Sequence, residues 1–514
     1  MAPAIFAADF NVALASLTNH NTSAYVAYNE TNFPANFGTT SWINQNGTTM
    51  AVDPTQMDES LNPITPGHVS HVDVHTLIPS RPDLRWFAHA TPWFGTGSHI
   101  NIGLVNNSDS YVAAMITDME SRGFNGVVID WYGQGDGTDG VTQKIKSYLA
   151  SQPGNTFTYI VMVDKGVRGG ANLTNLQAQI NYCKAQYFSD PNYEREPLTN
   201  GLPILMFFGV RAALGETSMA ILKGRLGGQM VWVEQGTSYI GESWEDECFE
   251  WTDQFNNGVN ASDPFNLAAV VSDYPTIQAS GKKFFGAMCA RFNGTLTKSV
   301  GWSMGKYLPG SNGLCLVERA AAINAAVPGS MTRMQWPTWS DWEEGTQVES
   351  GIENSFALAG RTSGSNTLAW SILSGDERTI DHYEIYASTN GVTAAFVGSV
   401  AAGIHATNVS QAGLPAGQYQ FYVDALGKPC VRDHMSQATP MTLAGPAGFG
   451  TAGNISVNYN SAAAPGPLTL SWSSGRLQSA PSVGGPYSDV PGATNPCVIE
   501  PSNAQQFFRI VSTP

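Results

Sequence analysis

The chain has little charge, and most of that charge is negative. Charged residues make up 13% of its 514 residues, and 25 Lys and Arg stand against 41 Asp and Glu, which gives a net charge of −16. A surface this acidic repels the phosphates of nucleic acids and the head groups of anionic membranes. We therefore expect a neutral partner, and neither nucleic acid nor membrane.

Long hydrophobic runs are also missing. No stretch reaches the ~18–20 apolar residues that a membrane-spanning helix needs, and the first residues, Met-Ala-Pro-Ala, carry no basic region that leads into a leader. The scarcity of lysine beside abundant Asn, Thr and Gly favours an exported, extracellular protein. We expect it to be a monomer.

Several motifs that would define other functions are absent. The six cysteines are widely spaced, without a Cys-x-x-Cys clip for zinc, and whether Cys289 pairs with Cys315 stays open. There is no Gly-x-Gly-x-x-Gly after a first strand, no phosphate-binding loop and no Gly-x-Ser-x-Gly elbow. Residues 68–75 hold three histidines and an aspartate, but without a fourth anchor they favour a polar strand or loop. We expect no metal and no cofactor.

Between residues 84 and 345, short apolar runs alternate with helical or loop stretches. The expected strands are 85–90, 126–130, 159–164, 203–208, 230–234, 283–288 and 331–336, and the expected helices include 110–120, 172–185 and 318–326. This alternation indicates a parallel sheet. It predicts an α/β fold, a (β/α)8 TIM barrel, with an open doubly wound sheet as the alternative.

Acidic residues follow these apolar runs. Asp130, Asp164 and Glu234 each stand at the end of an expected strand. Because the carboxyl ends of barrel strands build the active site, we expect all three to contact the substrate. Each also has a structural interpretation, as a turn residue or as a partner in an ion pair.

The segment 336–347, Trp-Pro-Thr-Trp-Ser-Asp-Trp-Glu-Glu-Gly-Thr-Gln, places acids among tryptophans. Sugar rings stack on indoles, and cleavage of a glycosidic bond needs a carboxyl proton donor with a second assisting group opposite. Asp341 and Glu344 are the candidate catalytic pair, since a loop leaving a strand can bring both over the barrel mouth. Glu343 is expected to be solvated or structural. The alternative is a helix start with its acids at the positive end.

Tryptophans close to the ends of expected strands are candidates for stacking on the sugar. They are Trp93, Trp131 and Trp339. Other tryptophans are expected in the core.

After residue 355 the pattern changes to short alternating strands and turns. We expect an N-terminal extension packing on the barrel (1–83), the catalytic barrel (84–355), a β-sandwich of fibronectin type III kind (356–445) and a small all-β module (446–514). The Gly- and Ala-rich stretch 445–453 is expected to be a linker.

Four segments carry a family resemblance. They are residues 87–94 (Phe-Ala-His-Ala-Thr-Pro-Trp-Phe), 123–132 (Gly-Phe-Asn-Gly-Val-Val-Ile-Asp-Trp-Tyr), 187–193 with 202–205, and 341–349 (Asp-Trp-Glu-Glu-Gly-Thr-Gln-Val-Glu). In this order, the region from about 84 to 350 resembles the α-glycosidases of glycoside hydrolase families 71 and 99. The last segment is similar to the family 99 catalytic loop, Glu-Trp-x-Glu-Gly-Thr.

The resemblance implies an endo-acting hydrolase of an α-glucan or α-mannan, with Glu344 as general acid/base and Asp341 as base or assisting group. Asp341 stands where family 99 typically has Glu and family 71 typically has Asp. Family 99 is associated with retention through the substrate's own 2-hydroxyl and family 71 with inversion, so both outcomes stay open. The alternatives are a catalytically silent carbohydrate-binding protein that uses the same cleft, and a structural surface protein in which the β modules matter most.

Overall fold

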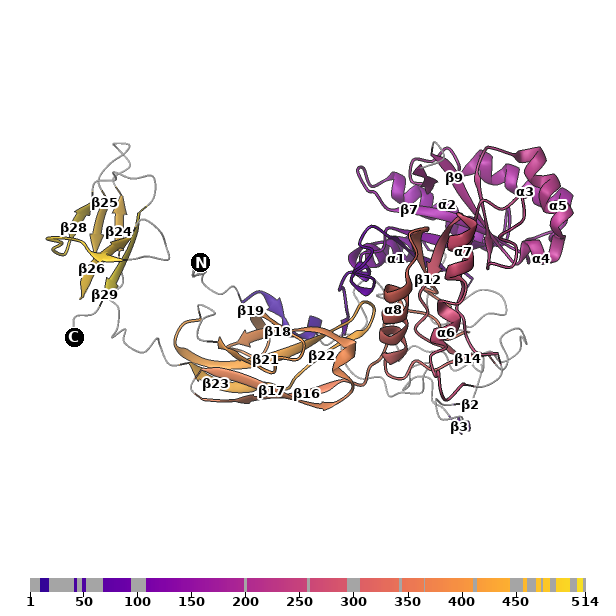
Figure 1. Ribbon diagram of the computed structural model, residues 1–514. Coiled ribbons are helices and arrows are strands. Elements are labelled where there is room, and N and C mark those ends of the chain that lie inside the picture. Colours follow the sequence, from indigo (N-terminus) through magenta and orange to yellow (C-terminus); the bar gives the residue numbers. More distant parts are fainter. Residues whose placement is uncertain are drawn as a thin grey trace.

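The computed structural model describes most of the chain. The described segments are 10–17, 41–43, 49–51, 68–93, 108–197, 201–256, 259–293, 306–341, 344–364, 366–409, 414–443, 456–459, 468–472, 475–480, 487–499 and 506–511. Within them the structure forms a barrel surrounded by helices, a two-sheet unit beside it and a separate group of strands near the C-terminus (Figure 1).

Within these segments, eight parallel strands close into a barrel. In hydrogen-bonded order they are β5 (Arg85–Ala90), β6 (Gly126–Trp131), β7 (Thr158–Asp164), β9 (Leu202–Phe208), β10 (Val231–Gln235), β11 (Glu247–Phe249), β12 (Lys283–Ala287) and β15 (Met331–Pro337). β15 pairs with β5, which closes the ring. The predicted (β/α)8 barrel is confirmed, and the open-sheet alternative is excluded.

Side chains alternate between the barrel interior and the layer under the helices. The interior is filled by Phe87, Val128, Ile160, Met162, Ile204, Met206, Val231, Val233, Phe249 and Phe285. Their neighbours along the strands, such as Ile129 and Leu205, face the larger core shared with the helices. Strands buried on both faces explain the continuous apolar runs in the sequence.

Helices cover the outside of the barrel. They are α1 (Asp109–Ser121), α2 (Gly137–Ala150), α3 (Leu173–Gln186), α4 (Val210–Leu214), α5 (Glu216–Leu226), α6 (Leu267–Val270), α7 (Tyr274–Ser280) and α8 (Leu314–Ala326). The side chains of Ser108, Asp136 and Asn172 cap the first three by accepting backbone N–H groups. The predicted helices 110–120, 172–185 and 318–326 are confirmed within α1, α3 and α8.

One barrel strand was missed by the sequence analysis. β11 has three residues and lies between Glu245 and Glu250, so it forms no apolar run. Other short strands are β8 (Arg195–Glu196), antiparallel to β9, and the pairs β2 (Ser41–Ile43) with β3 (Thr49–Ala51) and β13 (Phe292–Asn293) with β14 (Tyr307–Leu308). All six cysteines are free thiols.

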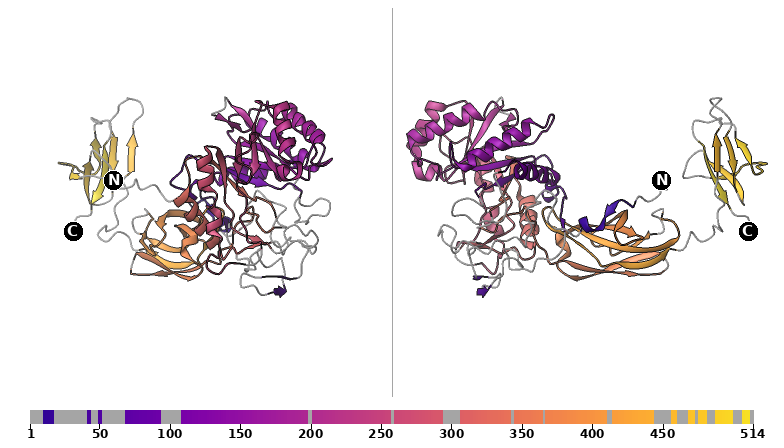
Figure 2. Two further views of the ribbon diagram at one scale, coloured as in Figure 1. Left: turned by 45° about the vertical axis from the view of Figure 1, so that its right-hand side comes forward. Right: turned by 180° about the vertical axis from the view of Figure 1, so that it is seen from behind.

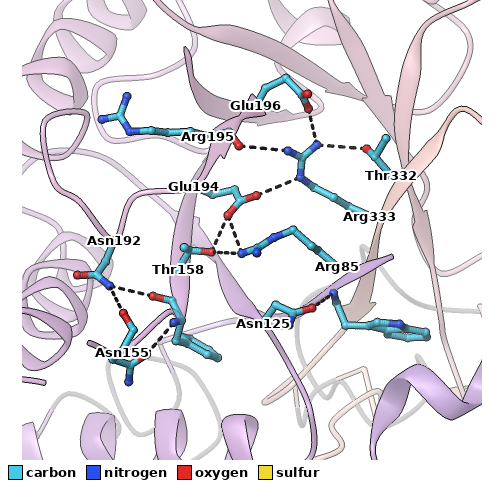
Figure 3. A network of polar contacts seen from close by, with 12 residues as sticks. Arg85, Asn125, Asn155, Thr158, Asn192, Glu194, Arg195, Glu196, Thr332 and Arg333 are labelled. Atoms are coloured by element: carbon cyan, nitrogen blue, oxygen red, sulfur yellow. Dashed lines mark hydrogen bonds and ion pairs between the residues drawn. The ribbon is translucent and has the colours of Figure 1, made fainter. Parts of the chain in front are cut away.

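A buried ionic network fills the amino-terminal end of the barrel (Figure 3). Arg333 of β15 is 2% exposed, and its guanidinium donates to Glu194 at 3.2 Å and to Glu196 at 2.8 Å. Arg85 of β5 donates to Glu194 at 3.0 Å. This network ties the segment around β8 under the strands and lies at the end opposite to the one that bears active sites in such barrels.

Residues 357–443 form two sheets over a common core. One contains β18 (Ile380–Ser388), β19 (Thr393–Ala401), β21 (Gly417–Gly427), β22 (Arg432–Met435) and β23 (Thr439–Leu443), and the other contains β16 (Ala357–Thr362), β17 (Thr367–Ser374) and β20 (Ala406–Asn408). A short 3-10 helix, η6 (Glu377–Thr379), precedes β18. Trp370 and Phe421 are buried between the sheets. A β-sandwich is therefore present, and its fibronectin type III kind stays a prediction.

The N-terminal extension contributes strands to this sandwich. β1 (Val12–Ala13) pairs with β19, and β4 (His68–Val69) pairs with β22. η1 (Leu14–Leu17) follows β1, while η4 (Val74–Leu77) reaches the barrel through the Val74 N–H, which donates to the Arg122 carbonyl. The described part of the extension therefore contacts the barrel, on which it was expected to pack, and also pairs with edges of the sandwich sheet. In the further views the sandwich again adjoins the barrel (Figure 2).

The C-terminal strands have a core of their own. β24 (Ser456–Tyr459), β25 (Leu468–Ser471) and β28 (Cys497–Ile499) form one sheet, and β26 (Arg476–Ala480), β27 (Ser488–Asp489) and β29 (Phe507–Val511) form another. Leu470, Trp472, Leu477 and Ile510 are buried together. An all-β module is thus present after the sandwich.

Candidate active site

Two aspartates mark the carboxyl ends of neighbouring barrel strands. Asp130 is inward-facing on β6, two residues after Val128, and Asp164 follows Ile160 and Met162 in the same way on β7. Both are buried, and the Oδ1 atom of Asp130 has no hydrogen-bond partner in the described part of the chain. A buried carboxyl oxygen without a partner is costly unless the group is protonated or meets a ligand.

The loop after β15 holds the predicted catalytic pair in a fixed turn. The Thr338 hydroxyl accepts the Asp341 N–H at 2.8 Å and lies 2.7 Å from the Thr346 hydroxyl. The Asp341 carboxylate accepts the Glu344 N–H at 2.9 Å. Asp341 and Glu344 therefore belong to one closed turn and not to the start of a helix, and the helix-start interpretation is excluded for the described residues around them.

Contacts with β5 and with Arg291 hold this loop in place. The Trp339 N–H donates to the His89 carbonyl of β5 at 2.7 Å. The buried Arg291 donates to the Gly345 carbonyl at 3.1 Å and to the Gln347 carbonyl at 2.7 Å. The loop is thus held at the mouth of the barrel by rigid elements, as a preorganised site requires.

Electrostatics join the four carboxyls into one cluster. Burial raises the pKa of Asp130 well above its ordinary value, and the nearby charges of Asp164, Asp341 and Glu344 raise it further. Burial also raises the pKa of Asp164, against the opposing effects of the Gly166 N–H and Lys165. Each of these charges opposes ionisation of Asp130, so the cluster holds a proton to a higher pH than an isolated carboxyl does. We call Asp130, Asp164, Asp341 and Glu344 the acid cluster.

Aromatic side chains border the acid cluster. Burial, and after it the charge of Asp130, raises the pKa of Tyr132 well above its ordinary value. The Trp93 ring meets the Tyr132 ring edge-on, with centroids 5.5 Å apart. Trp93 is therefore placed beside the cluster. Tyr132 was not among the predicted site residues, although it follows the predicted Asp130 by two positions.

His89 and Trp251 contact each other beside the side chains that fill the barrel interior, and neither was among the predicted site residues. His89 is fully buried, and burial lowers its pKa to about 3, with a weaker opposing effect of Gln335. Its ring meets Trp251 edge-on at 4.8 Å, and Trp251 in turn meets Phe208 at 4.8 Å. His89 lies two residues after the inward Phe87, but both faces of β5 are buried, so the sequence alone did not give its orientation. Trp251 follows the unpredicted strand β11.

Two predicted substrate tryptophans are core residues instead. Trp131 is fully buried on the helix side of β6, where its indole N–H donates to Asp139 at 3.1 Å and its ring stacks on Tyr182. Trp339 is fully buried between Phe124 and the Arg122 guanidinium, which lies 4.8 Å from its ring. Both predictions are corrected, because strand alternation and loop packing turn these rings away from the mouth.

Glu234 is likewise separated from the acid cluster. On β10 the inward residues are Val231 and Val233, so Glu234 faces the helices, where it accepts the Arg211 N–H at 3.4 Å at the start of α4. It is fully buried, and burial raises its pKa to about 9. The prediction that Glu234 binds the substrate is corrected by this outward orientation.

The described residues contain no group of three or more His, Cys, Asp or Glu arranged to hold a metal ion. In the 68–75 segment, Asp73 caps η4 by accepting the His75 N–H, and His75 Nδ1 lies 2.6 Å from the same carboxylate. Among the described helices, none is long and apolar enough to span a bilayer.

Comparisons with known proteins give remote structural similarity only. No family model matches the chain, and no curated protein matches its sequence. Among solved structures, it is similar to the GH99 endo-alpha-mannosidase from Bacteroides thetaiotaomicron, with 13% identity and a TM-score of 0.41 over 52% of this chain and 87% of that one. It is also similar to a glycoside hydrolase family 5 protein from Bacteroides vulgatus, with 8% identity and a TM-score of 0.30 over 75% of this chain and 94% of that one. At these TM-scores, a function for this chain has to rest on its own side chains.

Proposed function

We propose that the protein is a glycoside hydrolase that cleaves α-glycosidic bonds in a polysaccharide of α-1,3-glucan or α-mannan type. The observation that supports this most is the acid cluster at the carboxyl ends of β6, β7 and β15, beside Tyr132 and Trp93. Hydrolysis of a glycosidic bond needs a proton donor and a second carboxyl near the sugar, and aromatic rings bind its apolar faces.

Glu344 is the proposed general acid. It is only partly buried, on a turn whose backbone is held by Asp341 and Arg291, so its carboxyl can meet a glycosidic oxygen that enters from solvent. Proton transfer from Glu344 to that oxygen breaks the bond to the sugar carbon, which acquires positive charge. The negative charge of the surrounding acid cluster stabilises that developing charge.

Asp341 is the proposed second group. Its carboxylate is oriented by the Glu344 N–H, and it accepts a proton either from water or from the sugar's 2-hydroxyl. The two routes lead to inversion and to retention, respectively. Proton NMR of the first anomer released distinguishes them.

Asp130 and Asp164 are proposed to bind sugar hydroxyls. The raised pKa of Asp130 favours its protonated form, in which the carboxyl can donate one hydrogen bond as well as accept another. That dual capacity matches a hydroxyl group. Trp93 and Tyr132 are proposed to form the adjoining wall of the subsite.

The test is release of reducing ends from α-1,3-glucan, α-1,6-mannan and mixed α-glucans by the native protein and by Glu344→Gln. Turnover of one polymer that the variant loses by about 100-fold or more supports the proposal. Binding of a polymer without turnover by the native protein would favour the second candidate, a catalytically silent carbohydrate-binding protein.

A further inference from the structure

A cavity of about 470 Å³ lies against the sandwich, and none of the acid cluster lines it. It opens on the face of the β18–β21–β22 sheet that is turned away from the sandwich core, next to β4 and η1. Four carboxylates line it, namely Asp381, Glu384, Asp424 and Asp433. None of its lining residues belongs to the proposed active site, so any ligand here has a separate role.

Two of these carboxylates are direct neighbours across the strands. Glu384 of β18 pairs with Asp424 of β21, and like charges in that arrangement destabilise a sheet. Asp424 is 2% exposed, and its Oδ1 atom has no hydrogen-bond partner among the described residues. A buried carboxyl oxygen facing a cavity is a vacant acceptor for a donor from a ligand.

Among the described residues, the cations near the cavity reach its other carboxylates and not Asp424. His382 Nε2 lies 3.6 Å from Glu384, which also accepts the Tyr386 hydroxyl. Lys428 Nζ donates to Asp381 at 3.0 Å, and His382 Nδ1 lies 2.9 Å from the same side chain. His68 Nδ1 lies 3.8 Å from Asp433. Burial raises the pKa of Asp424 well above its ordinary value, and the charges of Asp433 and Glu384 add to this effect. Asp424 therefore keeps its proton to a higher pH than an isolated carboxyl does, and a cationic ligand would displace that proton.

The shape of the cavity favours an organic cation over a metal ion. Leu17, Val72 and Leu426 form apolar parts of its wall, and its volume exceeds that of a single ion. Within the described segments, no three His, Cys, Asp or Glu side chains are arranged here to hold a metal ion. Carboxylate oxygens accept most strongly from charged N–H donors.

We propose that this cavity binds a sugar unit that carries a free ammonium group, with the ammonium between Glu384 and Asp424. The choice of a sugar, and not of another amine, rests on the proposed function. Binding displaces the proton from the Asp424–Asp433 pair, so one ligand entering releases about one proton to the buffer. This second site would hold an amino-sugar-bearing glycan on the protein independently of cleavage.

The test is calorimetric titration of the full-length Glu344→Gln protein with glucosamine and its short oligomers, in two buffers of different ionisation enthalpy. N-acetylglucosamine, which has no ammonium group, is the matched neutral ligand. We expect binding of the amine forms only, with proton release, and an affinity about 30-fold or more weaker in Asp424→Asn. Because binding and not turnover is measured, failure here leaves the test of hydrolysis untouched.

Glu384→Gln provides a second variant, since it removes the opposite carboxylate at a partly buried position of the same pair of strands. If Asp424→Asn does not fold, as judged by its thermal midpoint, Glu384→Gln decides. Equal binding of glucosamine and N-acetylglucosamine, no binding of either, or unchanged affinity in the folded variants would overturn the proposal.

Discussion

Asp130 and Glu234 occupy similar positions in the sequence but have different surroundings. Each is the penultimate residue of an apolar strand, yet Asp130 faces the barrel interior and Glu234 faces the helices. Both faces of these strands are apolar, so alternation in the sequence cannot tell inward from outward positions. The sequence could predict an acid at the end of each strand. Whether its side chain faces the barrel interior or the helices depends on how the strand is aligned with its neighbours.

Glu234→Gln should make the protein more stable than the native form, and the difference should grow as the pH rises. The pKa of Glu234 is about 9 in the fold against about 4.5 when unfolded, so the unfolded chain loses its proton first and stability falls between these values. Glutamine mimics the protonated form and avoids this loss. At pH 4 we expect the variant and the native protein to have the same free energy of unfolding. Above pH 4.5 the variant should gain at most about 1.4 kcal/mol per pH unit relative to the native protein, measured by urea unfolding.

Glu242→Gln is the matched control, with the opposite sign. Arg211 donates to Glu242 and lowers its pKa, so the carboxylate stabilises the fold above its ordinary pKa and that contribution is lost as the pH falls. The variant should therefore be less stable than the native protein at pH 7. A stability of Glu234→Gln that does not change with pH relative to the native protein would contradict the buried, neutral state of Glu234.

Among the elements, the ends of β6 and β7 place two members of the acid cluster, and the packing of the loop after β15 places the other two. Seven of the barrel strands and the position of the Asp341–Glu344 loop were predictable from apolar runs and acids in sequence. β11 was not predictable, because its three residues lie among carboxylates and form no apolar run. Those carboxylates form ion pairs with cations that are distant in the sequence. Trp131 and Trp339 show the same limit, since packing and not proximity to a strand end decided where each ring lies.

The turn after β7 offers a steric test of the site. A Cβ atom at Gly166 would lie 2.8 Å from Tyr132 Cε1 and 2.9 Å from Asp164 Oδ1. Gly166→Ala should displace both side chains and lower kcat/KM by about 10- to 100-fold, because misplacement by an ångström is costly. Gly140→Ala in α2, where the added Cβ meets nothing within 4 Å, should leave kcat/KM unchanged. Equal kcat/KM in both variants would remove Tyr132 and Asp164 from the proposed site.

The ionic network at the opposite end should govern stability and not catalysis (Figure 3). Arg333→Met removes the guanidinium that the buried Glu194 and Glu196 share, which should destabilise the barrel by about 3–5 kcal/mol. Arg378→Met removes a half-exposed ion pair with Asp376 and should cost no more than about 1 kcal/mol. Thermal unfolding followed by near-UV circular dichroism compares them, and similar midpoints would contradict a structural role for the network.

At the scale of the whole molecule, the barrel and the sandwich share buried contacts. Arg432 of β22 is 1% exposed and donates to the Ser350 carbonyl at 3.0 Å and to Glu353 at 3.1 Å, in the segment that follows the Asp341–Glu344 loop. Arg122 of the barrel donates to the Val348 carbonyl at 2.7 Å in the same segment. The sequence predicted the change near residue 355 from alternating helices and strands to strands alone. It did not predict these contacts between the barrel and the sandwich, because the residues that make them are distant in the sequence.

Calorimetry of the intact protein should therefore show the barrel and the sandwich unfolding in one transition. Arg432→Met should lower its midpoint or divide it in two, since the buried Glu353 loses its partner. Arg476→Met, at an exposed pair in the C-terminal module, should leave that transition unchanged. Two separate transitions in the native protein would show that the two units are not coupled.

Hydrolysis by the acid cluster is tested most directly by kcat/KM on the responsive polymer for Glu344→Gln beside Glu343→Gln. Glu343 lies outside the described residues and was predicted to be solvated or structural, so it is a neighbouring acid of the same type. We expect kcat/KM to fall by about 100- to 10,000-fold in Glu344→Gln and to stay near the native value in Glu343→Gln. Equal losses in both, or full activity of Glu344→Gln, would contradict this expectation.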